Sequence, residues 1–358
     1  MRGKILRYLE CKQTMNQIQL EDCKTVFNQA SIVWEDFSGS TILVTGSTGL
    51  IGSNFVYALL YAKCEKNIDM DIILAVRNKE AAEALFGTKD VKIIGYDVTQ
   101  RIDIEEKIDY IVHMASPTSS KFFSERPVDT LCANFEGTKE ILELAKEKAV
   151  KKVIFISSME VYGFPERGHK VSENEVGGFE TMNARNSYPI AKIASEALCN
   201  AYHSQYGVPA VILRATQTFG PGVKFDDNRV FAQFMRCALE KKNIVLKSRG
   251  ETERSYVYTA DIVSALLICL QKAPAGEAFT VANPDTYCSI KEMAELVANE
   301  IAGGEIEVQF DIAEDIQKLG YAGTLFMDLD TSKIENLGWK ATTGLKDMFL
   351  RMMTGLEK

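Results

Sequence analysis

The sequence predicts an α/β fold in which a doubly wound parallel sheet is followed by a smaller C-terminal lobe. Three observations support this prediction. Short apolar strands alternate with longer amphipathic segments from Thr41 onward, a glycine-rich turn joins the first strand to the first helix, and the regular alternation ends after Gly220-Pro221-Gly222. Such alternation implies right-handed crossovers between parallel strands. A chain of 358 residues is long enough for two domains, or for one domain and a lobe.

An N-terminal extension, residues 1–40, precedes the first strand and is expected to form one or two helices. Its apolar residues recur at roughly helical spacing: Ile5, Leu6, Leu9, Cys23, Val26 and Phe27. We interpret the extension as an arm that covers the main domain or contacts another subunit, rather than as a separate binding module.

Residues 41–220 are predicted to form the main domain, of the Rossmann type. Each expected strand is a short apolar run, and each expected helix is longer, with apolar residues three and four positions apart. The expected strands are 41–45, 72–76, 91–95, 109–113, 152–157 and 209–214. The expected helices are 50–63, 79–86, 127–149 and 187–206.

Residues 221–358 are predicted to form most of the smaller, substrate-binding lobe, with some segments returning to the first domain. Glycine and proline interrupt the chain at its start, and the elements that follow are less regular. The expected helices lie near 228–241, 260–271, 289–302 and 344–354, and the expected short strands at 244–247 and 278–282.

Charge and composition exclude several classes of function. A net charge of −8 argues against a broad nucleic-acid surface, while it leaves room for a local basic pocket that binds one phosphorylated ligand. The chain has no apolar run of about 18 residues and no signal-peptide pattern, so we expect no membrane partner and a cytoplasmic location. Eight cysteines without a C-x-x-C pair and three scattered histidines (His113, His169 and His203) predict neither a disulfide framework nor a metal site.

The turn between the first strand and the first helix carries three glycines at intervals of three residues. Gly46 permits the tight turn, Gly49 lets the backbone approach a pyrophosphate, and Gly52 lets the helix pack closely. The helix N–H groups would face the anion. In this strand–turn–helix context the turn predicts a dinucleotide site. Its predicted cofactor-binding residues are Gly46, Thr48, Gly49, Leu50, Ile51 and Gly52.

The second strand lacks the acidic residue that usually binds the adenosine ribose in an NAD site. It ends in Val76-Arg77-Asn78, where Arg77 would either face a 2′-phosphate, which favours NADP, or lie along the adenine. The choice between NAD and NADP therefore stays open. Asp97 and Val98, after the third strand, are predicted to hold the adenine edge.

Tyr188 and Lys192 stand four residues apart, so they share one helical face. An ammonium this close stabilises a phenolate, and Tyr188 is therefore expected to take a proton near neutral pH. Tyr-x-x-x-Lys pairs are common by chance. This pair, however, opens the helix that follows the Ser157-Ser158 strand end, downstream of the dinucleotide turn.

These motifs together resemble the extended short-chain dehydrogenases/reductases, within the NAD-dependent nucleotide-sugar epimerase/dehydratase family. The resemblance covers about residues 40–355. It rests on TGSTGLIG, HMASP (113–117), NFEGT (134–138), SSMEVYG, YPIAK, RATQTFGPG (214–222) and RSYVYTADIV (254–263). It implies an enzyme that retains its NAD, oxidises a nucleoside-diphosphate sugar transiently at C4, and forms a homodimer through the helices near 127–149 and 187–206. It also implies that Ala115 contacts the cofactor.

The resemblance implies a role for each catalytic residue. Tyr188 would remove the proton of the sugar hydroxyl, and Lys192 would hold the nicotinamide ribose and lower the pKa of the tyrosine. Ser158 would hydrogen-bond the reacting oxygen, which leaves Ser157 as a structural hydroxyl. Glu160 matches a glutamate that 4,6-dehydratases and glucuronate decarboxylases share.

Five residues are expected to bind the substrate: Ser116, Ser158, Gln217, Arg229 and Arg254. Arg254 matches the arginine that grips the diphosphate, a task for which a bidentate guanidinium is suited. Arg229 is a second candidate for the nucleotide. Gln217 stands where the family usually has asparagine, so its contact to the substrate is expected to differ.

Met159 helps to predict which reaction follows the formation of the 4-keto sugar. A 4,6-dehydratase carries an acid at this position to protonate the leaving hydroxyl, and methionine cannot donate a proton. The departure favours decarboxylation or 4-epimerisation, and UDP-glucuronate decarboxylases are locally most similar through HMASP, EVYG and DDNRV (226–230). The alternatives are a 4,6-dehydratase, an NADPH-dependent carbonyl reductase and a non-catalytic dinucleotide-sensing protein.

Overall fold

A seven-stranded parallel sheet forms the centre of the computed structural model, which describes residues 15–117, 120–312 and 323–356. The strand order is β11-β7-β5-β4-β1-β2-β3. The strands are β1 (Ser40–Thr45), β2 (Met70–Val76), β3 (Lys92–Gly95), β4 (Tyr110–His113), β5 (Lys152–Ser158), β7 (Ala210–Ala215) and β11 (Ala278–Val281). The order reverses between β1 and β4, and ligands of such sheets bind outside the carboxyl ends of the strands at that point.

The strands are apolar along their length because both faces of the sheet are covered. In β1, Ile42 and Val44 belong to one buried cluster and Leu43 to another. Successive side chains of a strand point to opposite faces, so these clusters are the two cores on either side of the sheet. The prediction of apolar runs as strands worked here because most residues of β1, β2, β4, β5 and β7 are buried.

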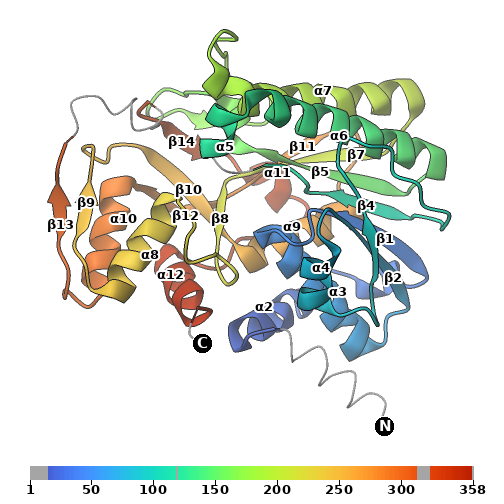
Figure 1. Ribbon diagram of the computed structural model, residues 1–358, viewed down its shortest axis with the longest axis horizontal. Coiled ribbons are helices and arrows are strands. Elements are labelled where there is room, and N and C mark those ends of the chain that lie inside the picture. Colours follow the sequence, from blue (N-terminus) through green and yellow to red (C-terminus); the bar gives the residue numbers. More distant parts are fainter. Residues whose placement is uncertain (1–14, 118–119, 313–322, 357–358) are drawn as a thin grey trace.

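Helices cover both faces of the sheet (Figure 1). One face carries α3 (Leu50–Lys66), α4 (Lys79–Phe86) and α9 (Thr259–Lys272), and the other carries α6 (Pro127–Lys148) and α7 (Ser187–Tyr206). Pro127 opens α6, where its missing N–H costs nothing, and Gly207 ends α7 in the left-handed conformation at φ 71°.

The smaller lobe is built around a second sheet. This sheet has the strand order β12-β10-β14-β6, with β8 also paired to β10. Its strands are β6 (Lys170–Val171), β8 (Gln217–Phe219), β10 (Glu253–Tyr258), β12 (Asn283–Ser289) and β14 (Phe326–Leu329), and a separate pair joins β9 (Ile244–Leu246) to β13 (Val308–Phe310). The helices of the lobe are α8 (Val230–Glu240), α10 (Ile290–Leu296), followed by a π-helical turn at Val297–Ile301, and α12 (Leu345–Thr354).

Two segments beyond residue 221 return to the main domain. β11 pairs with β7 at one edge of the central sheet, and α9 packs beneath that sheet with α3. The sequence did not predict β6, β12, β13 or β14, because they are short or contain residues that disfavour strands. β12, for example, begins Asn-Pro-Asp.

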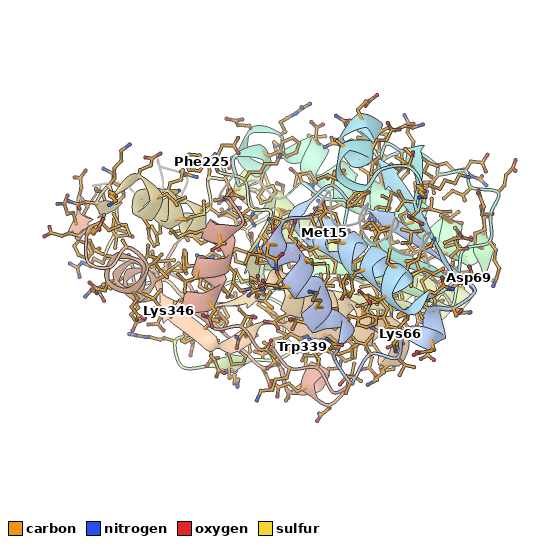
Figure 2. All side chains as sticks on the ribbon, turned by 90° about the horizontal axis from the view of Figure 1, so that it is seen from below. Met15, Lys66, Asp69, Phe225, Trp339 and Lys346 are labelled. Carbon is orange, nitrogen blue, oxygen red and sulfur yellow. The ribbon has the colours of Figure 1, made fainter. Side chains whose placement is uncertain are left out.

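The N-terminal extension forms α2 (Gln17–Phe27) and a 3-10 turn at Trp34–Phe37. Seen from below, α2 lies between α3 and α12 (Figure 2). A capping box at Asn16 begins the helix, and Cys23 and Val26 are buried in the same core cluster as α3. The expected apolar positions Ile5, Leu6 and Leu9 lie outside the described residues.

Candidate active site

The glycine turn after β1 is shaped by close backbone contacts. Gly46 has φ +70°, and a Cβ there would stand 2.7 Å from the backbone nitrogen of Ala115. A Cβ on Gly52 would stand 2.2 Å from the carbonyl oxygen of Gly46, so the first turn of α3 packs against the loop itself. A Cβ on Gly49 would stand 3.3 Å from the same carbonyl oxygen, a tight contact but not a clash, and Gly49 precedes α3 without a side-chain cap.

These features fit the pyrophosphate of a dinucleotide. The N–H groups at the start of α3 are not satisfied by a capping side chain, and they favour an anion. The hydroxyl of Ser47 is buried and has no hydrogen-bond partner within the part of the chain that the structure describes. Thr48 and Gly49 are exposed beside it, while Leu50 and Ile51 are half-buried. The turn therefore offers donors and open space at one point.

Arg77 and Asp97 follow β2 and β3, which are neighbouring strands of the sheet. Arg77 is exposed. Asp97 Oδ1 accepts hydrogen bonds from the backbone and hydroxyl of Thr99, at 3.1 and 3.0 Å, which fixes the loop. Val98 packs against Gly137 of α6, where a Cβ would come within 2.3 Å of its methyl group. Their place at the carboxyl edge suits an adenosine, but which of them contacts it remains a prediction.

Thr45 and Asn134 organise the segment after β4, although the sequence assigned neither of them a role. Thr45 Oγ1 accepts hydrogen bonds from the backbone nitrogens of Met114 and Ala115, both at 3.2 Å. Ser116 donates its hydroxyl proton to Asn134 Oδ1 at 2.8 Å, and Asn134 is buried. Thr45 and Asn134 lie inside the motifs TGSTGLIG and NFEGT, and that was the only signal available.

Ser158, Glu160, Tyr188 and Lys192 come together at the carboxyl end of β5. The Ser158 hydroxyl is close enough to Tyr188 to lower the pKa of the phenol. Lys192 Nζ donates to the carbonyl oxygen of Ile156 at 2.8 Å and lies 5.7 Å from the centroid of the Tyr188 ring. The structure thus brings together the four residues to which the sequence assigned catalysis.

Burial is the main influence on the protonation of Tyr188 and Lys192. Burial raises the pKa of Tyr188, the negative charge of Glu160 raises it further, and only the Ser158 hydrogen bond lowers it. Burial also lowers the pKa of Lys192 to about 7. Burial therefore opposes the expected phenolate near neutral pH, and Lys192 Nζ donates to a backbone carbonyl in this arrangement, so the phenolate stays a prediction.

Phe123 shields Tyr188, and the sequence did not indicate it. It lies on α5 (Ser120–Glu125), and its ring stacks on that of Tyr188 with centroids 4.2 Å apart and planes 7° apart. The hydroxyl of Ser187 donates to the carbonyl oxygen of Phe123 at 3.4 Å, which ties α5 to the start of α7. Phe123 itself is only 1% exposed.

The turn at Met159–Tyr162 sends its first two side chains in different directions. Ser158 Oγ accepts a hydrogen bond from the backbone nitrogen of Glu160 at 3.2 Å and so caps the turn. Met159 is buried in a hydrophobic cluster with Val171 and Met327. Glu160 stays part-exposed, with Oε2 at 4.0 Å from Arg185 Nη1. Burial raises the pKa of Glu160, and the charges of Arg185 and Arg254 partly offset that rise.

Ser157 has the structural role that was expected of it. Its hydroxyl donates to Glu196 Oε1 at 2.5 Å. Glu196 is also paired with Arg214, with Arg214 Nη2 at 2.8 Å from Oε2, and all three side chains are buried. Arg214 Nη1 donates to the carbonyl oxygen of Glu173, so the network joins β5, α7 and β7 to the loop after β6.

The expected substrate residues fall into two groups. Gln217 and Arg254 lie on the paired strands β8 and β10, and Gln217 Oε1 and Arg254 Nε are buried without a hydrogen-bond partner among the described residues. Arg229 instead forms a close ion pair with Asp227, at 2.5 Å between Nη2 and Oδ2, so its guanidinium is already engaged. The first two are the better placed for a polar ligand.

The histidines have structural partners. His113 Nδ1 lies 2.7 Å from Thr45 Oγ1, and burial lowers the pKa of His113 to about 3. His169 contacts Glu175, and His203 contacts the carbonyl oxygen of Val208. Within residues 15–117, 120–312 and 323–356, no group of three or more His, Cys, Asp or Glu side chains is placed to hold a metal ion. In the same ranges, no helix is both long and apolar enough to cross a bilayer.

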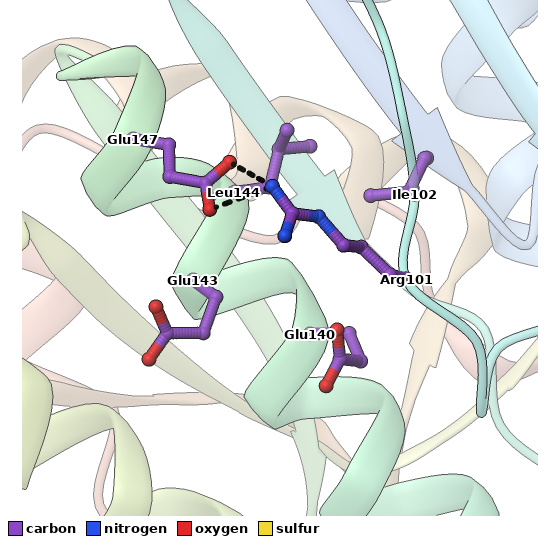
Figure 3. A pocket seen from close by; sticks show the side chains of 6 residues that line it. All are labelled: Arg101, Ile102, Glu140, Glu143, Leu144 and Glu147. Atoms are coloured by element: carbon purple, nitrogen blue, oxygen red, sulfur yellow. Dashed lines mark hydrogen bonds and ion pairs between the residues drawn. The ribbon is translucent and has the colours of Figure 1, made fainter.

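A separate hollow lies on the outer side of α6 (Figure 3). It has a volume of about 230 Å³. Its lining residues are Arg101, Ile102, Glu140, Glu143, Leu144 and Glu147. Arg101 Nη2 is paired with Glu147 at 3.1 Å. No predicted site residue lines this hollow, so it is distinct from the candidate active site.

Comparisons with known proteins agree with this geometry. The model of the NAD dependent epimerase/dehydratase family matches residues 42–282. UDP-glucuronic acid decarboxylase 1 of Xenopus tropicalis is 31% identical over 307 residues, which are 86% of this chain and 69% of that protein. UDP-glucuronic acid decarboxylase 6 of Arabidopsis thaliana is 32% identical over 276 residues, 76% of this chain and 77% of that protein.

Solved structures confirm the predicted fold class. An epimerase from Methanothermobacter thermautotrophicus has a TM-score of 0.75 at 21% identity, covering 92% of this chain and 95% of that chain. The dTDP-glucose 4,6-dehydratase DesIV of Streptomyces venezuelae has a TM-score of 0.72 at 22% identity, covering 88% of this chain and 96% of that chain. At these identities the likeness establishes the architecture alone.

Proposed function

The chain belongs to the NAD-dependent epimerase/dehydratase family, and from this premise we propose that it decarboxylates UDP-glucuronate through a transient 4-keto sugar. The arrangement of Met159 and Glu160 carries the proposal. A dehydratase needs a proton donor at position 159, and this side chain is a buried thioether that packs in an apolar cluster and accepts a hydrogen bond from the Thr216 hydroxyl at 3.1 Å. Glu160 is the one carboxyl group of the turn, and the positive charges of Arg185 and Arg254 act on it. The similarity to UDP-glucuronic acid decarboxylases supports the same reaction.

In this proposal the glycine turn holds NAD. Gly46, Thr48, Gly49, Leu50, Ile51 and Gly52 bind the pyrophosphate, Ala115 lies beside the turn, and Arg77, Asp97 and Val98 lie towards the adenosine. When bound, NAD accepts the hydride from C4 of the sugar and later returns it. Whether the cofactor is NAD or NADP depends on Arg77, since an exposed guanidinium at that strand end suits a 2′-phosphate as well.

Tyr188 and Ser158 act on the oxygen at C4. The two groups lie close enough for the Ser158 hydroxyl to lower the pKa of the phenol, and we propose that both bind the same sugar oxygen. Tyr188 removes the proton of this oxygen as the hydride leaves C4. A positive charge beside the phenol would bring its raised pKa down, and Lys192, with Nζ 5.7 Å from the ring centroid, is the cation that we propose for this role.

The ketone at C4 makes the C6 carboxylate a β-keto acid. The C5–C6 bond then breaks, carbon dioxide leaves, and the bonding electron pair remains in the sugar as an enolate. A proton enters at C5, and hydride return to C4 gives UDP-xylose. Glu160 is the group proposed to deliver the proton to C5, because burial raises its pKa and so favours the protonated form. Arg254 and Gln217 bind the diphosphate, while Ser116 and Arg229 lie at the edge of the site.

We also propose that the protein is a homodimer. Val128, Leu131 and Phe135 are exposed to 67%, 39% and 40%, and they follow one another at intervals of three and four residues along α6. Such spacing gives an apolar stripe on one helical face, which a second copy of the helix would bury. Light scattering of the purified protein tests this, and a monomer at micromolar concentration contradicts it.

The function is tested by offering the purified protein UDP-glucuronate, UDP-glucose and UDP-galactose. We expect carbon dioxide release and UDP-xylose formation from UDP-glucuronate, without net consumption of added NAD. Product NMR separates the other outcomes. Interconversion at C4 without carbon dioxide would show an epimerase, and a 4-keto-6-deoxy sugar would show a dehydratase. Net oxidation of NADPH with a simple aldehyde would show a reductase.

A further inference from the structure

Arg185 stands directly before the catalytic helix in a well-fixed backbone. It lies in the 3-10 turn Ala184–Asn186, which runs without interruption into α7. Its backbone nitrogen donates to Asn183 Oδ1 at 3.0 Å, and the side-chain nitrogen of Asn186 donates to the carbonyl oxygen of Glu180 at 3.0 Å. Because side chains three residues apart in such a turn share one side, Arg185 and Tyr188 face the same region.

The guanidinium of Arg185 lies near Glu160 and Phe123 in the candidate active site, and its contacts with both are long. Its Nη1 lies 4.0 Å from Glu160 Oε2, which is longer than a charge-assisted hydrogen bond. Its carbon Cζ lies 5.8 Å from the centroid of Phe123, the ring that stacks on Tyr188. The side chain is 29% exposed, so a ligand can reach it.

The local charge favours a second anion beside the diphosphate. Glu160 experiences two positive charges, from Arg185 and Arg254, so these three side chains carry a net charge of +1. Arg254 Nε is buried and has no partner in the described part of the chain. If Arg254 binds the diphosphate, Arg185 is the cation left beside Glu160 for another anionic group of the substrate.

We propose that Arg185 is the specificity-determining residue that binds the sugar carboxylate. This inference rests on the proposed function, which places C4 of the sugar at Tyr188. In a hexuronate the carboxylate is attached to C5, the neighbour of C4, and therefore lies within reach of a side chain that shares a face with Tyr188. A planar guanidinium matches the two oxygens of a carboxylate. UDP-xylose, which lacks that group, makes no such contact.

The test compares the dissociation constants of UDP-glucuronate and UDP-xylose by calorimetry on the full chain, with Tyr188→Phe present in every variant so that UDP-glucuronate is not converted into UDP-xylose during the titration. We expect Arg185→Gln to weaken UDP-glucuronate binding about 10- to 100-fold, the usual effect of losing one hydrogen bond to a charged group, and UDP-xylose binding less than about twofold. Arg185→Lys keeps the charge and should recover part of the preference. Arg101→Gln removes an arginine from the surface pair with Glu147 and should change neither constant.

Equal weakening of both ligands by Arg185→Gln, or of neither, overturns the inference. The retained binding of UDP-xylose shows that the variant is folded. Carbon dioxide release by the wild-type protein is measured separately. An Arg185-dependent preference for UDP-glucuronate without release of carbon dioxide supports the inference and overturns the proposed function. Carbon dioxide release with an unchanged preference in Arg185→Gln overturns the inference alone.

Discussion

The ring of Phe123 lies flat on the ring of Tyr188, with centroids 4.2 Å apart and planes 7° apart. Flat contact over this distance excludes water from one face of the phenol and fixes its orientation. Burial is also the main cause of the raised pKa of Tyr188. Phe123 therefore links the position of a short helix, α5, to the readiness of the proposed catalytic base.

Phe123→Ala should lower the pKa of Tyr188, because the phenol regains contact with water. In the pH dependence of kcat, the limb that reports deprotonation of the base should move to lower pH. The loss of orientation should still reduce kcat, by about 10- to 100-fold. Phe122→Ala, one residue earlier on the same helix, is the matched control. A pH profile that does not move in Phe123→Ala would show that the stack has no influence on the base.

Lys192→Met should stabilise the fold at low pH while abolishing activity. Lys192 is buried, and its pKa falls from 10.5 in the unfolded chain to about 7. The unfolded state therefore binds more protons between these values, so the stability contribution of Lys192 is complete above pH 10.5 and is lost as pH falls to 7. The stabilising effect of the substitution should reach up to about 5 kcal/mol below pH 7 and disappear towards pH 10.5. Urea unfolding at pH 6.5 and pH 9.5 measures the difference, and a pH-independent effect contradicts it.

Met159→Asp should destabilise the protein without creating a dehydratase. The side chain is 3% exposed and packs in a cluster with Val171 and Met327, so a carboxylate there loses apolar contacts and is buried without a matching cation. The free energy of unfolding should fall by at least about 2 kcal/mol. Met159→Leu, which keeps the volume, should cost less than about 1.5 kcal/mol. Formation of a 4-keto-6-deoxy sugar by Met159→Asp would mean that residue 159 reaches the substrate after all.

The strands of the main sheet were predicted well from the sequence because both faces of the sheet are buried. Strands in such a sheet consist largely of consecutive apolar residues. β5, with Val153, Ile154 and Phe155, is one example. The lobe lacks this signal, since β6 has two residues and β8 has three. Strands so short are held by their neighbours in space rather than by a local pattern.

The candidate site shows the same division between local and non-local information. Ser158, Tyr188 and Lys192 were predicted because their spacing within a motif reflects their chemistry. Phe123 was missed, since α5 has six residues and no periodic pattern. The burial that raises the pKa of Tyr188 was missed for the same reason. The spacing to Lys192 shows which charge is near, and it does not show that α5 covers the ring.

Asp22 gives a test of how the N-terminal helix is held. Its carboxylate accepts a hydrogen bond from Tyr258 Oη at 2.7 Å and lies 2.7 Å from Arg351 Nη2, and these residues are 236 and 329 positions away in the chain. The three side chains join α2 to β10 and α12. Burial outweighs both favourable partners and raises the pKa of Asp22 from 3.8 to about 6.

Asp22→Asn should therefore change the pH dependence of stability. Between pH 3.8 and about 6 the folded wild-type protein holds a proton that the unfolded chain has released, so the contribution of Asp22 is complete below pH 3.8 and is lost as pH rises to 6. The difference in free energy of unfolding between Asp22→Asn and the wild type should therefore rise in favour of the variant by roughly 3 kcal/mol from pH 3.8 to pH 6. This rise is expected whether the variant is more or less stable than the wild type at pH 3.8. Chemical unfolding at pH 4 and pH 7 measures this change, with Glu65→Gln on the exposed side of α3 as the control. A loss of relative stability over the same window would show that the pair with Arg351 dominates and that Asp22 is ionised in the folded protein well below pH 6.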